Sequence, residues 1–101
     1  MENRITVRID PDLEDLIPGF LENRRADVEK VRALAQSSSF ADIRMIAHSM
    51  KGAGGGYGFD EITVIGGDVE EAALSEDRDA VLAGMERLSD YLSRIDVVFE
   101  D

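Results

Sequence analysis

The stretch AHSMKGAGGGYG, residues 47–58, holds the only histidine of this 101-residue chain. If residues 40–57 form one helix at about 100° per residue, one side of that helix is apolar. The apolar positions are Phe40, Ile43, Ile46, Ala47, Met50, Ala53, Gly54 and Tyr57. By the same rotation, His48 falls outside this apolar side. We therefore expect a helix that packs on a core and presents His48 to water.

The outer side of this helix carries residues suited to phosphate chemistry. Four residues share it with His48: Arg44, Lys51, Gly52 and Gly55. A neutral imidazole is a nucleophile whose ring nitrogen can accept a phosphoryl group. Lys51 can supply positive charge to the phosphoryl oxygens, and Gly52 removes a side chain that would crowd a partner. A plain surface histidine leaves these neighbours unexplained, because each helical glycine costs roughly 0.5–1 kcal/mol relative to alanine.

Two features around this helix bear on its length and its partners. The helix either fades near Tyr57, with Gly58 as a left-handed terminator, or stops near Ala53 with the glycines in a loop. Three apolar side chains are candidates for a docking patch beside His48: Ala41, Met45 and Val64. The run contains neither a G-x-x-x-x-G-K-[ST] nor a G-x-G-x-x-G pattern, so a nucleotide-binding loop is not expected.

The N-terminal residues read differently from the rest. Residues 5–9, ITVRI, alternate apolar and polar side chains like a strand. Because the rest of the sequence looks helical, we expect residues 1–9 to form an extended arm on the bundle, or alternatively a dimer contact. Asp10 then caps a helix with Pro11 at its first position. Pro18 falls inside this helix and should kink it or split off a short initial piece.

Further helices are expected from Ser39 to the glycine run, from Asp60, and from Ser75 to the end of the chain. The last one carries apolar residues at alternating spacings of four and three: Val81, Met85, Leu88, Leu92, Ile95 and Phe99. That seam is typical of an antiparallel bundle. The sequence therefore predicts an all-α fold, an antiparallel four-helix bundle over residues 10–101 with a kinked or split first helix.

Composition limits the classes of function. The net charge of −11, from 22 acidic and 11 basic side chains, disfavours nucleic-acid binding, which needs a basic patch. There is no cysteine, no membrane-length apolar run and no signal-peptide pattern, so we expect a cytoplasmic protein. The acidic residues Asp68, Glu70 and Glu71 are interpreted as a solvated face rather than a metal site, because the pattern of inward carboxylates with Glu-x-x-His is missing.

At this point the residues resemble a known family. His48, Lys51 and Gly52, followed by Gly58 ten residues after the histidine, are similar to the signature of the histidine-containing phosphotransfer (HPt) domain. The Val69-Glu70 pair resembles the Glu-terminated helix that follows in such domains, and residues 10–18 resemble the first helix of bacterial members. The resemblance spans roughly residues 10–100.

The resemblance implies a phosphocarrier rather than an enzyme, with bacterial receiver domains or a sensor histidine kinase as partners. It implies Nε2 of His48 as the phosphoryl-accepting atom. No metal-binding carboxylate cluster is expected beside His48, so the partner receiver should bring Mg²⁺ and most of the catalysis. We expect a monomer. The alternative function is an interaction module that binds receivers or other proteins without being phosphorylated.

Overall fold

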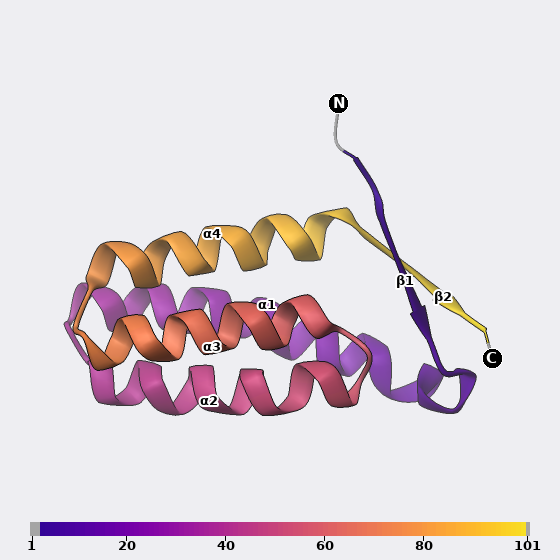
Figure 1. Ribbon diagram of the computed structural model, residues 1–101, viewed down its shortest axis with the longest axis horizontal. Helices are drawn as coiled ribbons and strands as arrows, with labels where there is room; N and C mark the ends of the chain where they lie inside the picture. The colour runs from indigo at the N-terminus through magenta and orange to yellow at the C-terminus, as the bar shows by residue number, and fades with distance from the viewer. Residues whose placement is uncertain (1–2, 101) are drawn as a thin grey trace.

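The computed structural model describes residues 3–100, and four helices form its body (Figure 1). Their bounds are α1 Ile17–Gln36, α2 Phe40–Gly56, α3 Asp60–Leu74 and α4 Arg78–Arg94. The chain runs along the bundle through α1 and back through α2, and α3 and α4 repeat this course. The predicted helical bundle is confirmed. The first two residues of the predicted arm and the last residue of the chain lie outside the described part.

The first helical segment is split, as Pro18 led us to expect. A 3-10 helix, η1 (Pro11–Leu16), precedes α1, and Pro18 lies in the first turn of α1. An N–H is not needed there, so proline is tolerated. Asp10 caps η1, because its Oδ1 accepts a hydrogen bond of 2.9 Å from the backbone N of Asp12. Leu16, the last residue of η1, is 53% exposed.

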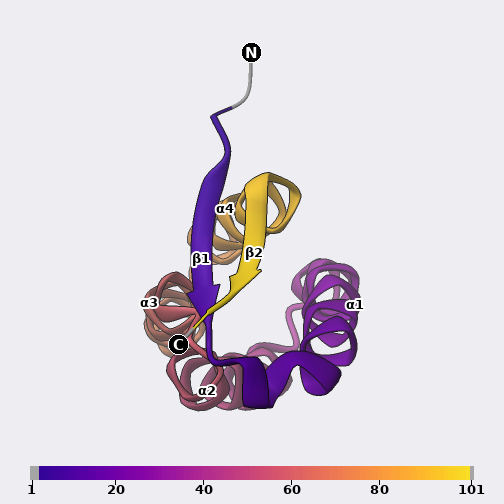
Figure 2. The same cartoon turned by 90° about the vertical axis from the view of Figure 1, so that its right-hand side faces the viewer.

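The fourth helix is shorter than predicted, and the N-terminal arm has a partner within the chain. Residues Ile95–Phe99 form a strand, β2, that pairs in parallel with β1, Ile5–Ile9. Figure 2 views the bundle from its end and shows these two strands lying across it. Pairing with β2 accounts for the alternating apolar and polar side chains of β1. From the sequence, this segment was expected to be either an arm on the bundle or a dimer contact. An ion pair of 2.8 Å between Arg4 and Asp96 spans the strands.

Three predicted helix starts differ in detail. α2 begins after Ser39, but the Ser39 side chain makes no capping hydrogen bond. α3 begins at Asp60 itself, which lies in the first turn and not at the cap position. α4 begins after Asp77 rather than at Ser75, because the Asp77 carboxylate accepts a hydrogen bond from the backbone N of Ala80 at 3.1 Å. At α2 and α4, a serine and an aspartate within three residues of one another made the start ambiguous.

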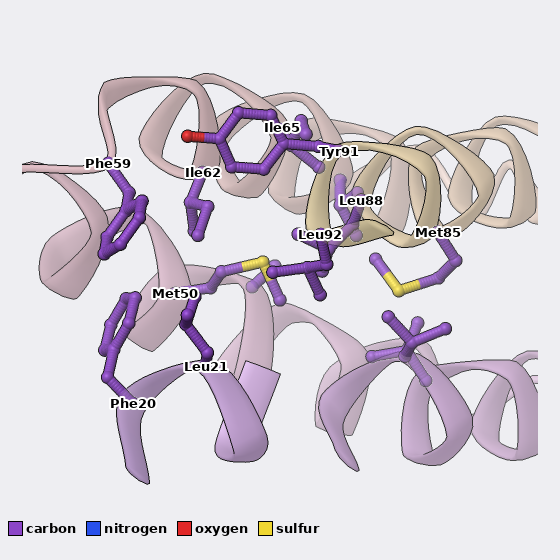
Figure 3. Close-up of a cluster of buried hydrophobic side chains, with 14 of the residues drawn as sticks. Phe20, Leu21, Met50, Phe59, Ile62, Ile65, Met85, Leu88, Tyr91 and Leu92 are labelled. Carbon is purple, nitrogen blue, oxygen red and sulfur yellow. The ribbon is translucent and has the colours of Figure 1, made fainter. Parts of the chain in front are cut away.

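All four helices and the strands contribute to one apolar core. No polar or charged residue within residues 3–100 is fully buried. Figure 3 shows Phe20 and Phe59 facing each other at one end of this core and Met85 at the other. The Phe20 ring stacks on Phe59 with centroids 5.4 Å apart and on Tyr57 at 4.5 Å. This cluster fixes the junction between α2 and α3.

Helices α2 and α3 approach each other more closely than side chains would allow. A Cβ atom at Gly66 would lie 2.7 Å from the backbone N of Lys51, and one at Gly54 would lie 2.7 Å from the backbone N of Thr63. Gly66 of α3 meets Lys51 of α2, whereas the earlier Thr63 meets the later Gly54, so the two helices run antiparallel. The glycines expected to weaken these helices therefore bring α3 against the backbone of α2.

Candidate functional site

His48 lies on the outer side of α2, as the helical periodicity predicted. Its side chain is 75% exposed, and its Nδ1 lies 2.8 Å from Oε2 of Glu70 on α3. Among the described residues, no hydrogen bond reaches Nε2. One ring nitrogen is thus held by the protein and the other faces solvent.

Glu70 is a site residue that the sequence interpretation missed. It was assigned to a solvated acidic face, but its side chain is only 20% exposed and Oε1 also lies 3.3 Å from Nζ of Lys51. The hydrogen bond with His48 lowers the pKa of Glu70 from its usual 4.5; partial burial opposes this, and Lys51 reinforces it. The carboxylate is therefore ionised near neutral pH and can only accept hydrogen bonds.

The ionised Glu70 determines which nitrogen of His48 carries the proton. Because the carboxylate only accepts, Nδ1 must donate the hydrogen bond between them. In the neutral imidazole, the lone pair then lies on Nε2. The ring therefore presents its nucleophilic nitrogen to solvent. The resemblance to the HPt signature had implied the same atom.

Lys51 and Gly52 occupy the next turn of α2. The Lys51 side chain is 49% exposed, and its ammonium group shares the Glu70 carboxylate with His48. A Cβ atom at Gly52 would find nothing within 4 Å, so a side chain there would extend into open space one turn from His48. The ammonium group of Lys51 and the open space at Gly52, both expected from the sequence, therefore lie beside the imidazole.

A shallow depression of about 610 Å³ adjoins His48 on the N-terminal side. It is lined by Ala41, Arg44, Met45, His48, Ser49 and Glu70. Met45 is 70% exposed, and Arg44 makes no ion pair with any residue of the part that the structure describes. Val64 on α3 is 51% exposed but does not line this depression. The depression thus brings Ala41, Arg44 and Met45 together with His48, and Val64 is not part of its lining.

The remaining glycines of the motif, Gly55 and Gly58, lie in different surroundings. α2 extends to Gly56, and Gly58 follows with φ of +92°, so the longer of the two expected helices is correct. At Gly58, a Cβ atom would also lie 2.7 Å from Cδ1 of Ile9. Gly55 is exposed, although a Cβ atom there would make an ordinary contact of 3.5 Å with Oγ1 of Thr63, and its N–H donates to that oxygen at 2.8 Å.

Within residues 3–100, no group of three or more His, Cys, Asp or Glu side chains is arranged to hold a metal ion. No helix in that range combines the length and the apolar character needed to cross a bilayer.

The chain matches the family model of the Hpt domain over residues 15–97. It therefore belongs to the histidine-containing phosphotransfer domain family. No curated protein and no solved structure gave a significant match. Membership implies phosphotransfer in two-component signalling, in which these domains act as phosphocarriers and interact with receiver domains and kinases. The match spans all four helices and His48.

Proposed function

We propose that this protein carries a phosphoryl group on His48 between the aspartates of receiver domains, or from a sensor histidine kinase to a receiver. The observation that carries this proposal is the way the imidazole is held. Glu70 fixes Nδ1 at 2.8 Å while the side chain as a whole is 75% exposed. A ring held at one nitrogen and open at the other can meet a partner's phosphorus without rearrangement.

In the transfer step, the lone pair on Nε2 attacks the phosphorus of an aspartyl phosphate on the partner. The bond between that phosphorus and the aspartate oxygen breaks, and the partner's carboxylate leaves with the electron pair. The ring then carries positive charge because Nδ1 keeps its proton. Glu70 stabilises that charge through the same hydrogen bond. Transfer to the next receiver is the reverse of this step.

The cations beside His48 are proposed to balance the phosphoryl oxygens. Phosphoryl transfer depends mainly on positioning and on neutralising charge. Lys51 lies in contact with Glu70 next to the ring, and Arg44 lines the adjoining depression. Glu70, the carboxylate nearest the ring, is already engaged by His48 and Lys51. We therefore assign Mg²⁺ to the partner receiver.

We assign partner docking to the exposed surface around the ring. Ala41 and Met45 would contact the partner directly, Val64 would extend the contact onto α3, and Gly52 and Gly55 would keep the approach clear. The site works as a monomer in this proposal, since His48, Lys51 and Glu70 come from one chain. Such partners operate in the cytoplasm, and neither nucleic acid nor membrane takes part.

Incubation with a phosphorylated receiver or a histidine kinase tests the proposal. We expect label on the chain that is labile to acid and stable to base, as a phosphoramidate bond is. His48→Gln should remove the label while the helical circular dichroism signal is kept, because the exposed ring contributes little to the core. If the receiver binds the wild-type chain but leaves no label on it, the protein is the interaction module instead.

A further inference from the structure

Thr63 of α3 forms a bridge to the backbone of α2 next to the site. Its Oγ1 donates a hydrogen bond of 2.9 Å to the carbonyl oxygen of Lys51 and accepts one of 2.8 Å from the N–H of Gly55. Residues 51 and 55 are the two ends of one helical turn. A hydroxyl is suited to this position because it is both a donor and an acceptor.

The bridged turn has a lower helix propensity than the rest of α2. Four of the five residues 52–56 are glycine, and each helical glycine costs about 1 kcal/mol relative to alanine. A turn of this composition at the end of a helix is expected to fray unless tertiary contacts hold it. Lys51 lies at the start of this turn, and its ammonium group must stay beside Glu70 and His48 to act on a phosphoryl group.

The close approach of the two helices makes the bridge possible. A Cβ atom at Gly54 would lie 2.8 Å from Oγ1 of Thr63, in addition to its clash with the Thr63 backbone. Gly66, one turn further along α3, lies against the backbone of Ala47 and Lys51. α3 therefore supports α2 from the turn before Lys51 to the turn after it, and Thr63 is the polar end of that support.

We propose that Thr63 is a positioning residue for phosphotransfer, which holds the turn 51–55 of α2 and thereby keeps Lys51 beside Glu70 and His48. This inference rests on the proposed function for its kinetic consequence. The effect of Thr63 on the position of Lys51, and through it on the pKa of Glu70, does not depend on the proposed function.

The test uses Thr63→Val, which keeps the shape but lacks the hydroxyl, and Thr63→Ser, which keeps the hydroxyl. Thr6→Val, at the chain's other threonine, on β1, is the matched control. From a phosphorylated receiver, Thr63→Val should accept label roughly threefold to tenfold more slowly, the effect of losing about one hydrogen bond. Thr63→Ser and Thr6→Val should transfer at the wild-type rate.

Two further measurements separate positioning of Lys51 from general loosening of the bundle. In a Lys51→Ala background, Thr63→Val should cause little additional loss of rate, because the residue it positions is gone. By NMR titration, Thr63→Val should move the Glu70 pKa in the same upward direction as Lys51→Ala, since Lys51 helps to lower it. Amide exchange at Gly55 should quicken, with core amides in α4 unchanged.

Equal rates for Thr63→Val and the wild type, or equal losses with and without Lys51, would overturn the positioning role. An unchanged Glu70 titration together with unchanged exchange at Gly55 would overturn the structural part as well. If the wild-type chain takes no label at all, the proposed function fails, while the titration and exchange data still decide whether Thr63 positions Lys51.

Discussion

The α2–α3 pair and the β1–β2 strands hold the chain together in different ways. Between α2 and α3, backbone meets backbone, because Gly54 and Gly66 have no side chains to separate the helices. The strands instead join through their hydrogen-bond ladder and through exposed ion pairs such as Arg4 with Asp96. A larger side chain can hardly be accommodated between α2 and α3, whereas the exposed ion pairs at the strands tolerate a change in side-chain volume. His48 lies on this closely packed pair, where Glu70 of α3 holds its Nδ1 while the side chain stays 75% exposed.

The largest effect on stability is expected at Gly66. With Gly66→Ala, the new Cβ atom would lie 2.7 Å from N and 3.0 Å from Cα of Lys51, and 3.0 Å from the carbonyl oxygen of Ala47. These are backbone atoms of a packed helix, so α2 and α3 must separate. We expect the free energy of unfolding to fall by about 1–3 kcal/mol, the usual range for overpacking. Urea denaturation measures it.

Gly67 provides the control for this prediction. A Cβ atom there would lie 3.7 Å from Cδ of Lys51, an ordinary contact with a flexible side chain. Gly67→Ala should therefore raise the free energy of unfolding by roughly 0.5–1 kcal/mol through helix propensity. If the two alanine variants were equally stable, close backbone packing would not distinguish the α2–α3 pair from the rest of the molecule.

The same comparison explains what the sequence could and could not predict. The exposure of His48 and the open space at Gly52 follow from rotation along a single helix, so they were predictable. The contacts from α3 were not, because Glu70 reaches His48, and Thr63 reaches the backbone of Lys51, only through the register of the two helices. That register depends on the glycine contacts, whose closeness no single-helix pattern contains. The Gly66-Gly67 pair was the available signal.

The end of α4 was mispredicted for a related reason. Leu92, Ile95 and Phe99 fit a helical seam, but Ile95, Val97 and Phe99 equally fit the alternation of a strand. The choice is made by β1, which lies about ninety residues earlier in the sequence and offers an unpaired edge. The local spacing of apolar residues carries no information about a partner strand that is so distant in the sequence. Residues 5–9 had given the strand signal without revealing what they would pair with.

Gly52 sharpens the contrast between a glycine needed for packing and one needed for access. Because a Cβ atom at this position would meet nothing within 4 Å, Gly52→Gln should leave the fold intact and raise the free energy of unfolding by up to about 1 kcal/mol. Phosphotransfer from a receiver should nevertheless slow by roughly tenfold or more, since a displaced approach is costly to transfer. Rates and urea midpoints measured together check this; a variant as fast as the wild type would refute the access role.

The pH dependence of stability tests the electrostatics of the site. The pKa of Glu70 is lower in the folded protein than its usual 4.5, mainly because of the hydrogen bond with His48. The stabilisation from its charge is therefore fully present above about pH 4.5 and is lost as the pH falls through the lower, folded value. Glu70→Gln should reduce the acid-induced loss of stability in that interval, measured by urea denaturation from pH 6 to pH 3. An unchanged profile would mean that Glu70 is not held by His48 in solution.

The smallest effect is expected at the strands. Arg4 and Asp96 lie 2.8 Å apart, but their side chains are 51% and 53% exposed, so water and salt screen the pair. Asp96→Asn should therefore lower the melting temperature less than Gly66→Ala does, and added salt should reduce the difference from the wild type. Phosphotransfer should be unchanged, because the strands cross the end of the bundle and, within residues 3–100, form no hydrogen bond or ion pair with His48 or Glu70. A loss as large as that of Gly66→Ala would show that the strands, and not the α2–α3 contact, limit the stability of the bundle.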